Sequence, residues 1–389
     1  MHHFLTLRLR SVQALSLLAV LLAACQPAPA TADPNIVMTA AFETAVAQIS
    51  IPTETPAPTD TPIPTATIPR TPPALPPTFQ SNGLQAGATP HTYISDSCQY
   101  LKAKWDPNNA PPGTIVMVIM FHTIEKATEH ATDPKNIGSG DFKRLMKNLH
   151  DFGFQAITTQ QLSDFLYNNT KIPPRSVLLV QDDRHAAQNF NDWFRPYWEQ
   201  WSWPVINGWI SVDGGKDINL SGNVALEKEG WVDHQAHGVI HNIPMTDSST
   251  DEYITSELQG SINIFQQYYG KTPIAIIWPG GGFGVRPVQI ARQLGYKLGF
   301  TVNPRGPIMF NWVPLADQQT GQFDIAEGPA NDPLMTLPRF WDADASSYLD
   351  KIRVIGDQAT AFAQQNKATE LEYYDIVCAP TYGPIPSTP

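Results

Sequence analysis

Two adjacent carboxylates follow a short apolar run in the stretch SVLLVQDDRHAAQNF, residues 176–190. The run from Val177 to Val180 is typical of a buried strand, and Asp182 and Asp183 come directly after it. Two like charges at the end of a core strand raise each other's cost of ionisation. A cation bound to one carboxylate would remove this cost and would leave the other free to take a proton.

Two histidines in the stretch WVDHQAHGVIHN, residues 231–242, have the spacing of metal ligands. His237 and His241 lie four positions apart, so that both imidazoles can reach one ion. Gly238 and the two β-branched residues after it disfavour a stable helix, so we expect this segment to be a loop after a strand. Combined with a strand-terminal aspartate, the pattern predicts an Asp/His/His metal site with open positions for water.

The elements that must position these residues alternate from about Gly113 onward. Runs buried on both faces that alternate with helices indicate a parallel sheet covered by helices, and this many β/α pairs favour a closed or nearly closed barrel. Reactive residues of such barrels lie at the carboxyl ends of the strands, which adds His122, after the first strand, to the candidates. We expect strands at residues 114–122, 154–158, 176–181, 203–211, 272–278 and 297–302, and helices at 139–153, 158–168, 190–201, 248–270 and 286–295.

The N-terminal part of the chain differs from the rest in composition. Residues 1–24 have a charged start and an apolar stretch that ends in LLAAC, as in a signal peptide. Leu22 to Cys25 resembles the lipobox of bacterial lipoproteins, which implies lipidation of Cys25 and an extracytoplasmic protein anchored to the cell membrane; the alternative is an ordinary signal peptide with a chance cysteine. Residues 25–90 are rich in Pro and Thr and predict a disordered linker, which leaves 91–389 for the folded domain.

Charge and cysteine content limit the partners and the compartment. The net charge is −11 and no Lys/Arg block follows the first dozen residues, so nucleic acid is not an expected partner. In an exported chain the remaining cysteines, Cys98 and Cys378, tend to form a disulfide; two unpaired buried thiols are the alternative. A bridge over so long a loop would contribute at most on the order of 5 kcal/mol.

The aspartate and histidine stretches resemble motifs of a known family. VQDDRH resembles the Thr-Phe-Asp-Asp-Gly motif, and HGVIH the His-(Ser/Thr)-x-x-His motif, of the polysaccharide deacetylases, the NodB-homology group of carbohydrate esterase family 4. The resemblance covers about residues 113–342 in the family's motif order. Four further stretches carry it: the opening strand VIMFHTI, the helix-strand-helix of the exported poly-N-acetylglucosamine type at 139–166, the loop IIWPGGGFG (Tyr-Pro-x-Gly in the family), and the late strand LMTLPRF.

The resemblance implies a distorted (β/α)7 barrel of the NodB type, and metal-dependent removal of N-acetyl groups from an N-acetylglucosamine-containing polysaccharide of the cell envelope. It implies Asp182 as the general base. It also implies a divalent metal ion, Zn²⁺ or alternatively Co²⁺ or Ni²⁺, as the cofactor. The partners are then the polysaccharide and, through the lipid anchor, the membrane; the oligomeric state stays open. The other implied residues are metal ligands Asp183, His237 and His241, and substrate contacts Trp278, Pro279, Gly280 and Arg184.

Several positions depart from the family pattern. Gln181 replaces the usual Phe, Arg184 replaces the Gly, and Trp278 stands near where many members carry an Arg that orients the base. Arg339 is the candidate for that orienting role. No Leu-x-His, the usual source of the general acid, is evident near the C-terminus, and the substitutes are His122, His185 and His234.

Two other functions compete with the deacetylase. A degenerate barrel that binds carbohydrate without turnover is favoured by the missing acid, whereas the retained Asp doublet and histidine pair oppose it. A zinc amidase of peptidoglycan is weaker, because it has no evident use for the doublet. Five tryptophans between Trp193 and Trp209 could stack on sugar rings, but their helical spacing beside a strand favours a core position.

Overall fold

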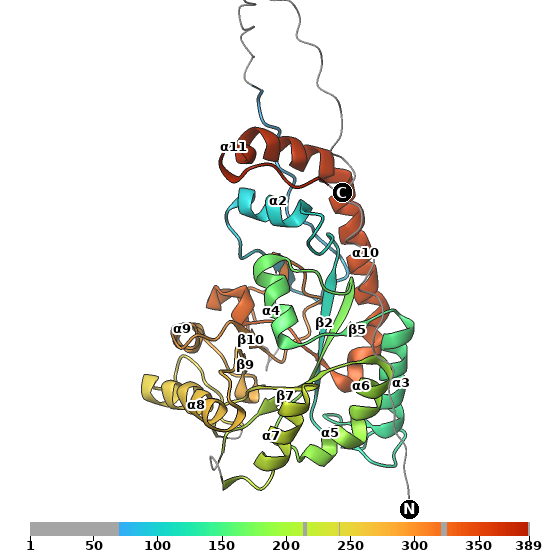
Figure 1. Ribbon diagram of the computed structural model, residues 1–389, viewed down its shortest axis with the longest axis vertical. Helices are drawn as coiled ribbons and strands as arrows, with labels where there is room; N and C mark the ends of the chain where they lie inside the picture. Colours follow the sequence, from blue (N-terminus) through green and yellow to red (C-terminus); the bar gives the residue numbers. More distant parts are fainter. Residues whose placement is uncertain (1–69, 213–215, 241, 320–324, 388–389) are drawn as a thin grey trace, which may run out of the picture. The chain divides into compact units, whose positions relative to one another are not determined.

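The computed structural model describes residues 70–212, 216–240, 242–319 and 325–387 (Figure 1). Pro69–Pro389 forms one compact unit. The proposed signal peptide, Cys25 and most of the linker lie outside the described residues, and so does His241. No helix within the described ranges is long and apolar enough to cross a membrane.

A curled parallel sheet forms the centre of the unit. Its seven strands lie in the order β10-β9-β8-β7-β6-β2-β12, and the short β5 pairs with β6 beside this path. Just before β12, Leu337 exchanges backbone hydrogen bonds with the end of β10, at 2.8 Å to Gly299 and 2.9 Å from Thr301, so the two ends of the sheet meet. The predicted distorted barrel is therefore confirmed. The strands are β2 (Ile115–Phe121), β5 (Gln155–Ala156), β6 (Arg175–Gln181), β7 (Val205–Trp209), β8 (Val232–Ala236), β9 (Ala275–Ile277), β10 (Leu298–Phe300) and β12 (Phe340–Trp341).

Helices follow the strands and cover the outside of the sheet (Figure 1). A capping box in which Thr158 and Gln161 satisfy each other's backbone N–H groups starts α4. The segment 190–201, predicted as one helix, is two, because Pro196 in the first turn of α6 lacks the N–H that a continuous helix needs. The helices are α3 (Ser139–Asp151), α4 (Thr159–Asn168), α5 (Ala187–Trp193), α6 (Arg195–Trp201), α7 (Leu220–Glu229), α8 (Asp251–Ile264), α9 (Val285–Gln293) and α10 (Asp342–Tyr373).

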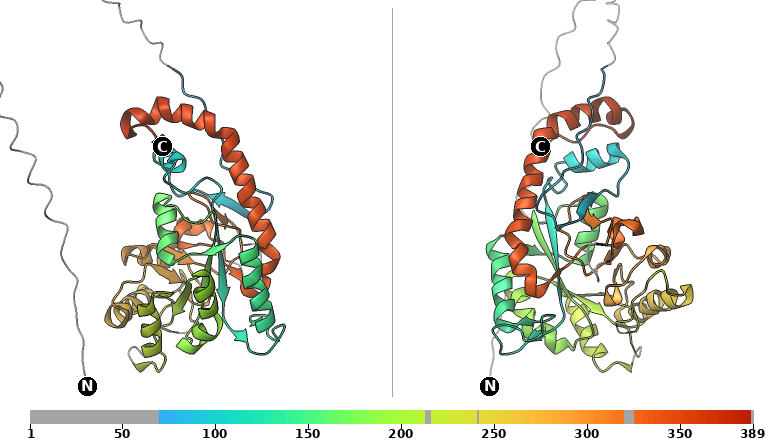
Figure 2. Two further views of the ribbon diagram at one scale, coloured as in Figure 1. Left: turned by 45° about the vertical axis from the view of Figure 1, so that its right-hand side comes forward. Right: turned by 180° about the vertical axis from the view of Figure 1, so that it is seen from behind.

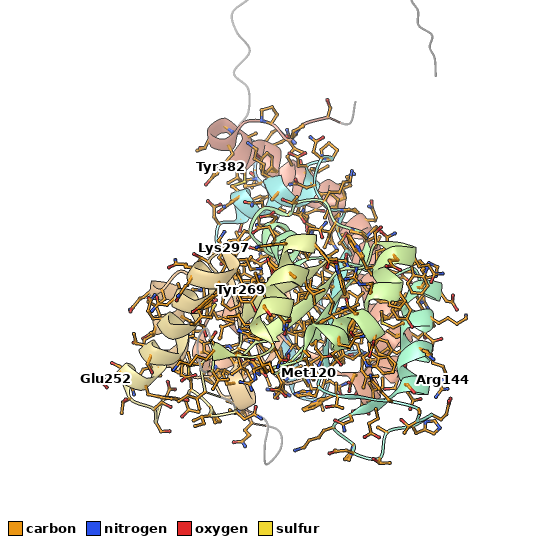
Figure 3. All side chains as sticks on the ribbon, turned by 60° about the horizontal axis from the view of Figure 1, so that its bottom comes forward. Met120, Arg144, Glu252, Tyr269, Lys297 and Tyr382 are labelled. Atoms are coloured by element: carbon orange, nitrogen blue, oxygen red, sulfur yellow. A yellow bond between two sulfur atoms is a disulfide. The ribbon has the colours of Figure 1, made fainter. Side chains whose placement is uncertain are left out.

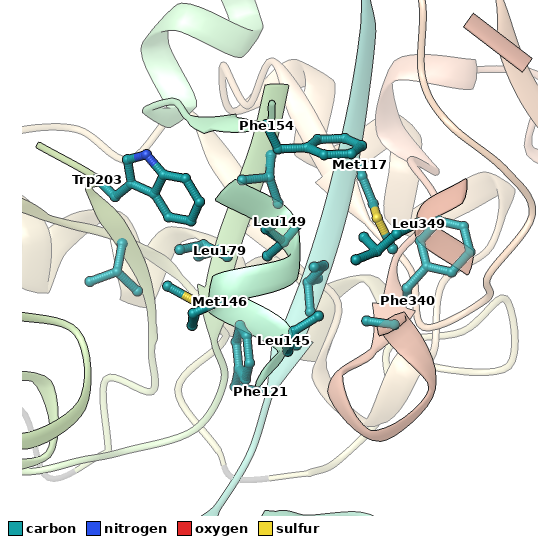
Figure 4. Packing of buried hydrophobic residues seen from close by; sticks show 14 of the residues in the cluster. Met117, Phe121, Leu145, Met146, Leu149, Phe154, Leu179, Trp203, Phe340 and Leu349 are labelled. Atoms are coloured by element: carbon teal, nitrogen blue, oxygen red, sulfur yellow. The ribbon is translucent and has the colours of Figure 1, made fainter. Parts of the chain in front are cut away.

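The largest apolar cluster lies between the outer face of the sheet and the helices α3 and α10 (Figure 4). Met117 and Leu179 of neighbouring strands pack there with Leu145 and Leu349 of the two helices, and all four are buried. Each such side chain contributes roughly 1.5–3 kcal/mol through its burial. Of the five clustered tryptophans, Trp203 and Trp209 are buried and Trp193, Trp198 and Trp201 pack against this core, as their spacing predicted.

Residues 70–90, which the composition assigned to the linker, lie on the folded unit in the structure. The backbone carbonyl of Phe79 accepts a hydrogen bond of 2.9 Å from the indole of Trp312, and the two rings lie 5.8 Å apart. Farther along, β1 (Ala88–His91) pairs antiparallel with β11 (Val313–Ala316). The proline-rich composition hid these contacts, because a few apolar side chains among many prolines suffice to dock a segment.

A disulfide joins the two ends of the described chain, as predicted. Cys98 in α2 (Ser97–Trp105) and Cys378 at the end of the π-helical turn Tyr374–Cys378 have Cα atoms 5.2 Å apart. Figure 2 shows α10 running along one side of the barrel to the end where α2 and α11 (Ala379–Tyr382) lie. There the buried Glu370 of α10 accepts from Lys104 at 2.8 Å and from the indole of Trp105 at 2.7 Å. The long C-terminal helix is thus fixed to the barrel at both of its ends.

Candidate active site

The ends of β2 and β6 bring two predicted site residues next to each other. The strands pair in parallel with Phe121 opposite Gln181, and the N–H of Asp182 donates to the carbonyl of Phe121 at 2.8 Å. His122 and Asp182 are therefore neighbours at this edge of the sheet. Figure 3 views the molecule toward this end of β2, near which Met120 is labelled, with α8 on one side and α3 on the other.

Gln181 ties the two strand ends together. Its side-chain amide donates to the backbone carbonyls of His122 at 2.7 Å and Phe121 at 3.1 Å, and the side chain is fully buried. The family carries an apolar Phe at this position. In this chain, hydrogen bonds to the neighbouring strand replace that apolar packing, so the departure is compatible with an ordered site.

Asp182 is held as a buried carboxylate by Arg339. Only 2% of the Asp182 residue is exposed, and its Oδ1 accepts from Nη1 of Arg339 at 2.6 Å. Burial raises the pKa of Asp182, but the charges of Arg339, His237 and His122 and the hydrogen bond from Arg339 together outweigh this and lower the pKa below its usual range. Arg339 is itself buried, and its Nε donates to the carbonyl of Thr301 at 2.6 Å. The structure thus places Arg339 where an orienting cation would lie.

Asp183 points toward His237 because its backbone leaves the strand conformation. Its φ of +67° is in the left-handed region, which non-glycine residues adopt rarely and often at functional sites. Its Oδ1 lies 3.5 Å from Nε2 of His237. This histidine follows β8, which is separated from β6 by one strand, β7. The two adjacent aspartates therefore have different partners.

His237 has the orientation that a metal-ligating histidine requires. Its Nδ1 donates to the backbone carbonyl of Ile277 at 2.8 Å, which fixes the ring and leaves Nε2 facing Asp183. Burial lowers the pKa of His237. The hydrogen bond to Asp183 and the charge of Asp182 raise the pKa by more than this, so the net shift is upward. A nitrogen and a carboxylate oxygen this close together are donors that suit a divalent metal ion such as Zn²⁺.

The described start of the predicted histidine segment, residues 237–240, is anchored by α8. Gly238 has a φ of +75°, which a residue with a side chain would adopt only with strain. The next two N–H groups, of Val239 and Ile240, both donate to the buried carboxylate of Glu257, at 2.7 and 2.9 Å. The segment is a loop after β8, as predicted. Within the described ranges no group of three or more His, Cys, Asp or Glu side chains could hold a metal ion, and the third predicted ligand, His241, lies outside those ranges.

His122 lies at the mouth of the site and is a quarter exposed. Its Nε2 is 3.8 Å from Oδ2 of Asp182, and its ring stacks on Trp341 with a centroid distance of 5.1 Å. Burial lowers the pKa of His122, and the charge of Asp182 offsets this only in part. Among the proposed substitutes for the general acid, His122 is therefore the one that the structure brings to Asp182.

The other two substitutes have different surroundings. Both ring nitrogens of His234 are engaged, at 2.8 Å with Glu227 and 3.0 Å with Asn223 of α7, and the side chain is completely buried. His234 is thus part of the layer between β8 and α7, which makes its proposed acid role wrong. His185 lies near the strand ends, with its Nε2 2.9 Å from the amide nitrogen of Gln181.

One predicted substrate contact is wrong. Trp278 is completely buried, and its indole N–H donates to the carbonyl of Met335 at 2.8 Å. A Cβ on Gly299 would come within 2.8 Å of this indole nitrogen, so the glycine makes room for the ring. An aromatic side chain next to a Pro-Gly turn can point toward the substrate or into the core, and here the space over Gly299 directs it inward.

The remaining predicted contacts differ in exposure. Pro279 is buried, whereas Gly280 is exposed in the turn after β9 with a φ of +56°. Arg184 follows the doublet, and its Nε forms an ion pair of 3.3 Å with the buried carboxylate of Asp217. This pair holds a guanidinium close to the site, where the family has a glycine.

Two residues that the sequence analysis missed lie on the short strand β12 and directly after it. Trp341 stacks on His122, and Asp342, the first residue of α10, is a buried acid. Burial and the nearby charge of Asp182 raise the pKa of Asp342 to about 8, although its hydrogen bond from the N–H of Ala343 lowers it. The position of Trp341, two residues after the predicted orienting cation Arg339, could have identified it.

The structure thus places carboxylates and histidines at the strand ends of a curled α/β barrel. Comparison with known proteins agrees: residues 221–299 match the family profile described as polysaccharide deacetylase. This match lies within the part of the chain in which the motifs predicted a polysaccharide deacetylase domain of the NodB type.

Individual relatives are distant. The Bacillus subtilis protein YxkH, whose name describes it as a polysaccharide deacetylase, is 24% identical over 192 residues, which are 48% of this chain and 64% of YxkH. The Streptococcus pyogenes deacetylase PplD is 21% identical with a TM-score of 0.45, over 58% of this chain and 92% of PplD. IcaB from Ammonifex degensii is 13% identical with a TM-score of 0.46, over 62% and 97% of the two chains.

Proposed function

We propose that this protein is a metal-dependent hydrolase that removes N-acetyl groups from an N-acetylglucosamine-containing polysaccharide of the cell envelope. The observation that carries the proposal is that the two adjacent aspartates, Asp182 and Asp183, contact different partners. Asp182 is buried and paired with Arg339 at 2.6 Å, whereas Asp183 faces the imidazole of His237 at 3.5 Å. Amide hydrolysis at a metal needs such a set, with one carboxylate for the proton and another for the ion.

Each residue then has a defined task. A divalent metal ion, Zn²⁺ in the first place and Co²⁺ or Ni²⁺ as alternatives, would polarise the acetamide carbonyl and acidify a water molecule. Asp183 and His237 would hold this ion, together with His241. Asp182, kept ionised by Arg339, would accept the proton of the attacking water. His122, with Nε2 at 3.8 Å from Asp182, would return a proton to the leaving amine.

A second candidate, a barrel that binds carbohydrate without turnover, is favoured by one observation. Arg184 directly follows Asp183, and its Nε forms an ion pair of 3.3 Å with Asp217. The family has a glycine at this position, which has no side chain. A bulky cation at this point narrows the approach to Asp183. If it blocks the acetamide, sugar binding can persist while hydrolysis is lost.

Acetate release from an N-acetylglucosamine oligomer, with and without chelator, distinguishes these functions. We expect release that the chelator abolishes. Asp182→Asn should keep the metal and lose turnover by roughly 100-fold or more, the usual contribution of a general base, whereas His237→Ala should lose metal and activity together. His130→Ala, which changes an exposed histidine paired with Asp141, is the control. Tight metal binding with no acetate release from any such polymer would favour the binding module.

The place of action is part of the proposal. An envelope polysaccharide as substrate agrees with the lipobox-like stretch at Cys25 and with the disulfide between Cys98 and Cys378, since disulfides persist outside the cytoplasm. We therefore propose that the protein is extracytoplasmic and held at the membrane through lipidated Cys25. The polysaccharide and the membrane are its proposed partners.

A further inference from the structure

Trp341 has no role in the proposed chemistry, yet its ring contacts a residue that does. It ends the two-residue strand β12, which pairs in parallel with β2 so that Trp341 lies opposite Met120. This register places Trp341 at the edge of the sheet that carries His122. The indole and the imidazole are nearly parallel, with 15° between their planes and 5.1 Å between their centroids.

The stack matters because none of the described residues fixes the His122 ring through a hydrogen bond. Catalytic imidazoles are usually oriented by a hydrogen bond at the nitrogen that does not react. Here Nδ1 of His122 is buried and has no hydrogen-bond partner in the described part of the chain. The distance from Nε2 to Asp182 is 3.8 Å, which is too long for a hydrogen bond. Ring packing is therefore the contact available to set the orientation of this imidazole.

The residue directly before this strand holds the proposed base. Arg339 lies two positions before Trp341 and one before β12. Arg339 contacts Asp182 at 2.6 Å, while Trp341 covers His122. One short segment, residues 339–341, thus contacts both members of the proposed proton-transfer pair, and any shift of this segment would move both together.

We propose that Trp341 is a positioning residue, whose indole face holds the imidazole of His122 so that Nε2 is directed to Asp182 and to the substrate. This inference rests on the proposed function, because it assigns His122 a proton to transfer. Stacking also restricts rotation of the His122 side chain without occupying either ring nitrogen, so that one nitrogen stays available for the leaving amine. A misplacement of about 1 Å at a reacting group can cost a factor of about 100 in rate.

The test compares Trp341→Leu with Trp341→Phe in the full chain. Leucine removes the aromatic face and phenylalanine keeps one. We expect Trp341→Leu to lower kcat by about 10- to 100-fold with KM changed by less than about 2-fold, and Trp341→Phe to restore most of the loss. Metal content should equal that of the wild type in both variants. Trp201→Leu is a matched control, because Trp201 stacks on the surface residue His150 with the same 15° between planes, and it should leave kcat unchanged.

A second measurement is independent of activity. In NMR spectra, the carbon-bound protons of the His122 ring, assigned with His122→Asn, should show an upfield ring-current shift that Trp341→Leu removes and Trp201→Leu does not. If the wild type releases no acetate, the proposed function fails, and the ring-current shift still tests the stack. The inference is overturned by any of three results in an active wild type: unchanged kcat in Trp341→Leu, a rise in KM alone, or equal losses in the Leu and Phe variants. Absence of the ring-current shift would overturn it as well.

Discussion

Asp342 offers a direct test of the electrostatics around the site. Its carboxyl group is buried at the start of α10, and only 1% of the residue is exposed. Burial raises its pKa from 3.8 to about 8, and the charges of Asp182 and Asp344 add to this rise. The folded protein therefore keeps this proton at neutral pH, where an unfolded chain has released it. Asp342→Asn replaces the acid by a neutral amide of the same shape, which can still accept from the N–H of Ala343.

The sign and size of the effect follow from proton linkage. Below about pH 4 the carboxyl is protonated in both states, and its burial carries no ionisation cost. Between about pH 4 and pH 8 the unfolded state binds fewer protons than the folded state, so wild-type stability falls as the pH rises. Each pH unit in this window costs about 1.4 kcal/mol. From pH 5 to pH 7 the wild type should thus lose about 3 kcal/mol of unfolding free energy through Asp342, and Asp342→Asn should not.

The pH dependence of the unfolding free energy is measured by urea unfolding of both proteins at several pH values, with the disulfide intact and equal metal content. The stability of Asp342→Asn minus that of the wild type should increase steadily from pH 5 to pH 7 and level off above about pH 8. Asp344→Asn, which changes an exposed carboxylate on the same helical turn, should differ from the wild type by less than about 0.5 kcal/mol throughout. A constant difference between Asp342→Asn and the wild type would refute the conclusion that Asp342 is protonated in the folded state.

Two further predictions concern the ends of the chain. Replacing Cys98 and Cys378 together by serine should lower the free energy of unfolding by up to about 5 kcal/mol, because the bridge closes a loop of 280 positions; equal urea midpoints for the variant and the oxidised wild type would contradict this. Cys25→Ser should release the protein from the membrane fraction or leave its precursor unprocessed, and unchanged processing and membrane association would rule out lipidation at this residue.

The sequence predicted the strand ends well because apolar runs are strong local signals. The run before Asp182 and the run before His122 both form strands of the sheet, and their parallel pairing brings the following residues together. Alternation of strands and helices was sufficient to predict a barrel. Residues 237–240 were also predicted correctly as a loop, because Gly238 adopts a backbone conformation that a helix excludes.

Contacts between distant parts of the chain were harder to predict. Arg339 and Asp182 are separated by 157 positions, and no local pattern indicates that they meet. The family resemblance suggested this pair, and Arg339, directly before the two-residue strand β12, forms it. The burial of Trp278 depends on the space over Gly299, which belongs to the neighbouring strand. The sequence around Trp278 alone does not show that Gly299 leaves room for the indole ring.

The long helix α10 was missed for a different reason. Its buried face alternates large residues such as Leu349 and Ile355 with small ones such as Gly356 and Ala359. Small residues weaken the apolar periodicity that marks an amphipathic helix. They also permit close packing: a Cβ on Gly356 would come within 3.0 Å of the Ile115 side chain. The feature that lets α10 approach the barrel thus also hides it in the sequence.

The two adjacent carboxylates at the end of β6 have different partners because the backbone separates their environments. Asp182, directly after the end of β6, reaches the buried guanidinium of Arg339, which compensates its charge without a metal ion. Asp183 turns away through a φ of +67° and faces His237. Had both residues kept the strand conformation, their side chains would lie on opposite faces of the sheet, and only one could reach the site. The strained backbone at Asp183 therefore brings two carboxylates with different partners to one edge, which is what the proposed division between base and metal ligand requires.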